Sequence, residues 1–268
     1  SSATTLLVST ALEWMNSHKS GVPKEKRKLL GFTDNRQDAA LQAGHFNDFI
    51  EVGLLRSALY NAAVASGPDG LDHSQLTQRV FEVLQLPRER YASNPDAKYE
   101  VKRRTDSALR DVLGYRLYFD LQRGWRVSSP NLEQCGLLEI RYESLNEIVA
   151  DETLWSGRHR ALAGATPEER LTVCKALLDY MRRELAIKVD YLDYNFQERL
   201  KRDSSQHLIP PWAIDENEQL FSSPQMKIGP YQSGESRYHL WLSPRGGFGQ
   251  FLRRRSTFPN YSFPARGK

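Results

Sequence analysis

A short apolar run that leads into a polar turn and then a helical pattern most constrains the fold of this chain. Residues 29–33 (Leu-Leu-Gly-Phe-Thr) are too few for a helix and are typical of a buried strand. Asp34 or Asn35 can cap a helix that begins near Arg36, and helical spacing of apolar residues resumes up to Ala65. A strand, a tight polar turn and a helix make half of a βαβ unit, which predicts a piece of an open α/β sheet.

Helical patterns dominate the rest of the 268-residue chain. Apolar residues recur at helical spacing, between capping and breaking residues, over residues 4–17, 75–84, 95–121, 166–187 and 191–202. Two short strands are expected at 125–127 and 137–142, on either side of a Pro-Asn turn. From Pro210 onward prolines and glycines multiply, so we expect little regular structure there.

The charge of the chain is unevenly placed. Its 37 Lys and Arg exceed its 33 Asp and Glu, which leaves a net charge of +4. Residues 236–268 hold seven of these cations, no acid and seven aromatic side chains. Cations pair with phosphates and aromatic rings stack on bases, so Arg253, Arg254 and Arg255 are candidate nucleic-acid contacts. The alternative is an arm that packs its aromatic rings onto the core and leaves its arginines in water.

The sequence lacks the patterns of catalytic, metal and cofactor sites. Six scattered His and two Cys form no ligand set, and Cys135 is expected to be a buried structural thiol. The glycines at 246–249 lack the Lys-Ser/Thr of a phosphate-binding loop. We therefore expect no catalytic residue, metal or cofactor in this chain. The apolar runs are too short to span a membrane, and the few cysteines indicate a reducing, cytoplasmic setting.

The polar turn after the predicted strand is the most specific candidate site. Thr33, Asn35, Arg36 and Gln37 place a hydroxyl, amides and a guanidinium at the carboxyl end of that strand, where open α/β sheets bind ligands. Together with the free N–H groups of a helix start, they suit a phosphate. The alternative is a helix cap with a surface salt bridge for Arg36.

These residues carry a resemblance to a known family. Residues 28–49 resemble motif IV of large bacterial superfamily 2 DEAD/DEAH-box helicases, and read KLLGFTDNRQDAALQAGHFNDF. Residues 123–145 resemble a downstream part of the same enzymes. The resemblance implies that residues 1–50 open the second RecA-like motor domain and that Thr33, Asn35 and Arg36 contact a nucleic-acid backbone. It implies ATP and Mg²⁺ in the parent protein, although this chain lacks the motifs that bind them.

The region after the motor segment has the order helix, helix and hairpin, which winged-helix modules share. Arg103 and Arg104 lie on or near the would-be recognition helix, and Trp125 and Arg126 lie at the base of the would-be wing. The alternative is that Trp125 fills a helical core while the basic residues form a solvated surface. The basic pairs at 182–183 and 201–202 are expected to face solvent.

The expected fold class is therefore α+β and predominantly α-helical. A partial RecA-like βα unit is followed by a helical accessory region with a winged-helix-like hairpin. We expect four regions: the start of the motor domain, a helical region with the hairpin, a second helical region and a basic-aromatic tail. Their ranges are residues 1–66, 67–150, 151–209 and 210–268.

The expected function is that of a non-catalytic fragment of an ATP-dependent superfamily 2 helicase or translocase. Its partners would be DNA or RNA, the rest of the parent chain and further protein subunits, with no membrane. One alternative is a helical module that docks the helicase to partner subunits. Another is a free-standing winged-helix regulator that binds nucleic acid.

Overall fold

The computed structural model describes residues 2–17, 19–28, 36–122, 130–229 and 239–255. At 2–6, 36–50 and 252–255 the description covers the backbone alone. The chain forms two compact units. The first comprises residues 1–71 and 79–86, and the second comprises residues 72–78 and 87–268.

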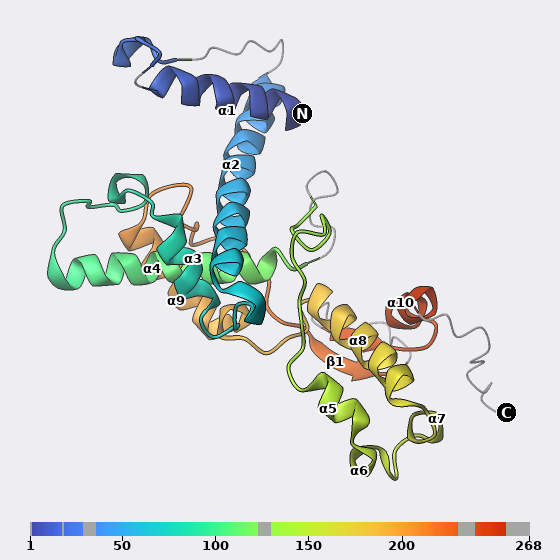
Figure 1. Cartoon of the computed structure of the whole chain (residues 1–268). Coiled ribbons are helices and arrows are strands. Elements are labelled where there is room, and N and C mark those ends of the chain that lie inside the picture. Colours follow the sequence, from blue (N-terminus) through green and yellow to red (C-terminus); the bar gives the residue numbers. More distant parts are fainter. Residues whose placement is uncertain (1, 18, 29–35, 123–129, 230–238, 256–268) are drawn as a thin grey trace. The chain divides into compact units, whose positions relative to one another are not determined.

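The first unit is helical over its described residues. It contains α1 (Ser2–Asn16), the short 3-10 helices η1 (Lys24–Lys26) and η2 (Gly67–Asp69), and α2 (Arg36–Ala65), which α1 contacts (Figure 1). The predicted helix is confirmed from Arg36, the first residue described after the gap at 29–35, and α2 runs unbroken for 30 residues. Val52, Leu55, Ala58 and Ala62 form its buried stripe at helical spacing. The predicted strand at 29–33 lies outside the described residues, so the RecA-like unit stays a prediction.

The helix α3 (Leu76–Leu84) follows the predicted range and is shared between the two units. From Pro87 the second unit continues with η3 (Arg88–Arg90) and the 21-residue α4 (Tyr99–Phe119). The carboxyl-terminal part of α4 packs against η4 (Asp190–Leu192) and α9 (Tyr194–His207). Leu109, Val112 and Leu113 are almost completely buried there. This part of α4 is therefore a core helix.

Local signals set the ends of the helices that follow. The short helices α5 (Leu145–Ala150), α6 (Glu152–Trp155) and α7 (Arg160–Ala163) precede α8 (Pro167–Arg183). The predicted start of α8 is confirmed, because Thr166 and Glu169 form a reciprocal capping box before and within its first turn. The helix ends before the predicted residue 187, because Leu185 adopts the left-handed conformation with φ of 55°.

A small parallel sheet and one helix form the last described part of the chain. The sheet pairs β1 (Gln225–Ile228) with β2 (His239–Leu242), in a register that sets Gln225 opposite His239. The final helix α10 (Gly247–Arg255) contacts both β2 and α8. The expectation of little regular structure after Pro210 is therefore wrong for these three elements.

The predicted strand at 137–142 is also wrong, because this segment is not a strand, pairs with no strand that the structure describes and is held to α8 by side chains. Its predicted partner at 125–127 lies outside the described residues. The winged-helix-like hairpin thus lacks its second strand. The described residues form an α-rich α+β fold, as expected. Within the described ranges, no helix combines the length and apolar character needed to cross a membrane.

Candidate nucleic-acid interface

The structure describes the predicted contact residues to different extents. Thr33, Asn35, Trp125 and Arg126 lie outside the described residues. Two groups are described by their backbone alone: Arg36 and Gln37 in the first turn of α2, and Arg253, Arg254 and Arg255 in the last turn of α10. Arg103 and Arg104 are fully described, and they are neighbours in the exposed first part of α4. The predicted contacts whose side chains the structure describes therefore lie at the beginning of α4.

A cluster of exposed cations surrounds these two arginines. Residues 98–104, which we call the α4 basic turn, read Lys-Tyr-Glu-Val-Lys-Arg-Arg and hold four cations and one acid, Glu100. Every residue of the turn is exposed, with 76% of the Arg103 side chain and 64% of the Arg104 side chain accessible. Such a surface attracts phosphates through released counterions. The turn is therefore a candidate backbone-binding surface.

Glu100 is the local competitor for these arginines. Arg103 donates to it from Nε at 3.0 Å and Nη2 at 2.9 Å, and Arg104 donates from Nε at 3.1 Å. These hydrogen bonds lower the pKa of Glu100 below its ordinary value. Exposed pairs of this kind contribute little free energy, so a phosphate can replace the carboxylate. Lys98 and Lys102 form no ion pair with any residue that the structure describes.

A hydrogen-bonded loop positions the α4 basic turn. The guanidinium of Arg88 donates from Nη1 to the carbonyls of Pro95 at 2.9 Å and Ala97 at 2.8 Å, directly before Lys98. Tyr91 donates from its hydroxyl to Asp106 on α4 at 2.8 Å. Burial, with this carboxylate as a second cause, raises the pKa of Tyr91 to about 12. The loop thus holds the start of α4 in one geometry.

The later arginines of α4 bind protein groups instead. Arg110 donates to the side chain of Gln78 at 2.8 Å. Arg116 donates to the carbonyl of Pro211 at 2.6 Å, and its guanidinium lies 5.2 Å from the ring centre of Trp212. Since this half of the helix is a core element, it is unsuited to the role of a recognition helix in a groove.

The described part of the tail packs onto α8. The rings of Phe248 and Phe251 each lie 5.5 Å from the ring of Tyr180, and the guanidinium of Arg183 lies 5.6 Å from the ring of Phe251. The interpretation in which the tail packs its aromatic rings onto the protein is confirmed for these two phenylalanines. The three arginines at 253–255 stay a prediction.

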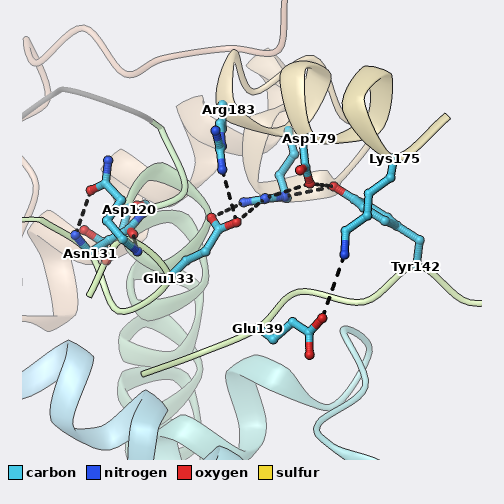
Figure 2. A network of polar contacts seen from close by, with 10 residues as sticks. Asp120, Asn131, Glu133, Glu139, Tyr142, Lys175, Asp179 and Arg183 are labelled. Atoms are coloured by element: carbon cyan, nitrogen blue, oxygen red, sulfur yellow. Dashed lines mark hydrogen bonds and ion pairs between the residues drawn. The ribbon is translucent and has the colours of Figure 1, made fainter. Parts of the chain in front are cut away.

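The buried polar face of α8 was missed by sequence reasoning. Arg182, expected to face solvent, is only 4% exposed. It donates to Glu133 through two bonds of 2.8 and 2.7 Å, and to the hydroxyl of Tyr142 at 3.2 Å. Tyr142 in turn donates to Asp179 at 2.8 Å. Figure 2 shows Glu133, Asp179 and Tyr142 joined by this row of contacts.

The burial and partners of Glu133 and Tyr142 shift the pKa values of these two residues. Burial would raise the pKa of Glu133, but the hydrogen bonds and charges of Arg182 and Arg183 lower it below its ordinary value. Burial raises the pKa of Tyr142 to about 12. Arg182 also donates to Asp179 at 3.2 Å, so it binds both Asp179 and Glu133. We conclude that the network fastens Glu133 and Tyr142 to α8.

A second buried guanidinium, that of Arg170, binds residues of the short helices α5, α6 and α7. Arg170 is 1% exposed and donates to both carboxylate oxygens of Glu152, at 2.8 and 2.9 Å. It also donates to the carbonyls of Val149, Leu162 and Ala163. No sequence signal marks such partners, because the pairing is created by the tertiary fold. Like the Arg182 network, this cluster is structural.

Two smaller expectations, for Cys135 and for the basic pair at 201–202, have mixed outcomes. Cys135 is exposed, so the expectation of a buried thiol is wrong. Lys201 is largely buried and pairs with Glu198 at 2.7 Å, whereas Arg202 faces solvent as expected. No cluster of three or more potential metal ligands occurs among the described residues.

Comparison with known proteins finds no matching family model, no similar curated protein and no similar solved structure. The resemblance to helicase motif IV therefore rests on the residues quoted above.

Proposed function

We propose that this chain is a non-catalytic part of a cytoplasmic, ATP-dependent superfamily 2 helicase or translocase and contributes contacts to a DNA or RNA backbone. The observation that carries the proposal is the α4 basic turn, where four exposed cations accompany one exposed acid. Phosphate contacts of this kind supply affinity and register without reading base sequence. ATP and Mg²⁺ would bind elsewhere in the parent protein and drive its movement.

The first unit supports the motor-domain part of the proposal. The residues from Arg36 onward, for which the motif IV resemblance implies a helix, form α2. Leu7 and Trp14 on α1, and Tyr60 and Val64 on α2, are exposed. Exposed apolar side chains of this kind fit helices that cover a larger sheet in the parent.

A charge-matched comparison tests the proposal. The chain would be titrated into a fluorescent single-stranded oligonucleotide at low salt. A variant with Lys98, Lys102, Arg103 and Arg104 changed to Gln should bind at least about tenfold more weakly. The control changes four exposed cations elsewhere in the second unit to Gln: Arg158, Arg160, Lys188 and Arg202. Equal affinity of the two variants would contradict the proposal.

The exposed apolar side chains of α1 and α2 also favour a second candidate, a module that docks the helicase to partner subunits. The same titration separates the two functions. If the wild-type chain does not bind oligonucleotide even at low salt, while it binds a purified subunit of the parent assembly, the docking function replaces the first proposal.

A further inference from the structure

Tyr99, in the middle of the cations of the α4 basic turn, has an unusual exposure. Its side chain is 89% exposed although it is a large aromatic ring. It makes no hydrogen bond and no ring contact with any residue that the structure describes. The folded chain therefore gains almost nothing from the presence of a ring at this position.

The backbone conformation of Tyr99 is also unfavourable for a large side chain. Its φ of 49° lies in the left-handed region, which glycine tolerates and bulky residues avoid. Residues held in such a conformation cluster at binding and functional sites. Here the conformation occurs at the first residue of α4, after the turn that Arg88 holds through Pro95 and Ala97. The ring is thus exposed, and it is attached to a backbone that follows directly on the turn bound by Arg88.

The neighbours of the ring carry the charge that a nucleic acid would need. Lys98 precedes Tyr99, and Lys102 and Arg103 follow three and four residues later, which is one helical turn. An aromatic ring beside cations is the arrangement that binds single strands, since each unpaired base offers a free face while its phosphates meet the cations. In a duplex those faces are covered by neighbouring base pairs.

We propose that Tyr99 is a base-stacking platform and that the α4 basic turn therefore takes single-stranded nucleic acid in preference to duplex. This inference rests on the proposed function and adds the class of substrate and a specific residue to it. Three other aromatic side chains among the described residues of the second unit have different surroundings. Phe248 and Phe251 pack on Tyr180, and exposed Tyr194 lies between Asp193 and Glu198 on α9.

The variant Tyr99→Gly tests the inference without a risk of unfolding. It removes the ring and also relieves the left-handed backbone, so the chain should melt at an equal or higher temperature. Its affinity for labelled oligo(dT) should fall about 5- to 100-fold, the range that loss of one stacked base produces. Affinity for a blunt duplex of the same length should stay within about twofold. Tyr99→Trp should keep oligo(dT) affinity.

Two controls make the outcome specific. Tyr194→Gly removes an exposed tyrosine from acidic surroundings and should leave oligo(dT) affinity unchanged. An abasic strand with the same number of phosphates should bind wild type and Tyr99→Gly equally, because the lost interaction needs a base. Unchanged oligo(dT) affinity of Tyr99→Gly, or an equal loss on the abasic strand, overturns the stacking role.

The proposed function fails in a different way. If the variant with four cations changed to Gln binds oligo(dT) as wild type does, the basic turn is not a phosphate surface and both proposals are wrong. If that variant loses affinity while Tyr99→Gly does not, only the stacking platform is wrong.

Discussion

Arg182 and Glu133 form a two-bonded ion pair across 49 residues of sequence, with bonds of 2.8 and 2.7 Å. Arg182 belongs to α8, whereas Glu133 belongs to a segment with no helix or strand of its own. Such a segment has few backbone bonds to hold it, so its position depends on side chains such as these. The pair is therefore a specific determinant of the second unit.

Removal of one partner should leave the other charge uncompensated. We expect Arg182→Met to lower the free energy of unfolding by about 3 kcal/mol. Urea unfolding of the full chain, followed by circular dichroism, measures this change. Arg202→Met, at a cation that is 72% exposed, is the matched control and should change stability by less than about 0.5 kcal/mol. Equal effects of the two substitutions would show that the buried pair has no special role.

The pair of Arg182 and Glu133 also makes the free energy of unfolding depend on pH in the acidic range. The pKa of Glu133 is lower in the folded chain than its ordinary value of 4.5. Its contribution is therefore present above about pH 4.5, and it is lost as the pH falls through the lower folded pKa. Glu133→Gln should flatten this part of the stability profile in urea unfolding at several pH values. Glu139→Gln, at an exposed carboxylate, should not, and a steep profile that persists in Glu133→Gln would contradict the account.

Gly114 of α4 allows a close approach of the Tyr191 ring. A Cβ atom at this position would overlap the ring, which is held by Tyr118 on one side and Phe196 on another. We expect Gly114→Ala to destabilise the chain by about 1–3 kcal/mol. Gly53→Ala is the control, because nothing lies within 4 Å of its Cβ and alanine favours a helix interior. A gain of thermal stability in both variants would contradict the packing described for α4.

Glu100 competes with phosphate for Arg103 and Arg104. Glu100→Gln removes that competition and also raises the net charge of the α4 basic turn. Oligonucleotide affinity at low salt should therefore increase by about three- to tenfold, and the gain should shrink as salt screens the charges. Fluorescence anisotropy measures both effects. Glu198→Gln on α9 adds the same charge elsewhere, and an equal gain from that variant would locate the binding surface away from α4.

Local signals predicted the helices well because their causes lie within a few residues. Thr166, Pro167 and Glu169 marked the start of α8, and the helical spacing of apolar residues after Arg36 predicted α2. In contrast, α10 contains glycines that favour a loop, and it forms a helix whose Phe248 and Phe251 pack on Tyr180. Tertiary packing overrides weak local preference in such short helices.

The errors at 137–142 and on the buried face of α8 share a cause. The first segment alternates as a strand does, but Glu139 and Tyr142 are held by side chains of α8, and none of the strands in the described ranges pairs with it. Likewise, Arg182 is buried because Glu133 meets it there, and no local pattern encodes a partner 49 residues away. In the candidate site, the charge of the α4 basic turn was readable from sequence, whereas the exposure and backbone conformation of Tyr99 were not.

The salt dependence of oligonucleotide binding tests the central claim most directly. Each phosphate contact to a single strand contributes about 0.7 to the slope of log affinity against log salt. The wild-type chain should therefore bind with a slope steeper by about 2 to 3 than the variant with Lys98, Lys102, Arg103 and Arg104 changed to Gln. Identical slopes for the two proteins would contradict the assignment of the α4 basic turn to the nucleic-acid backbone.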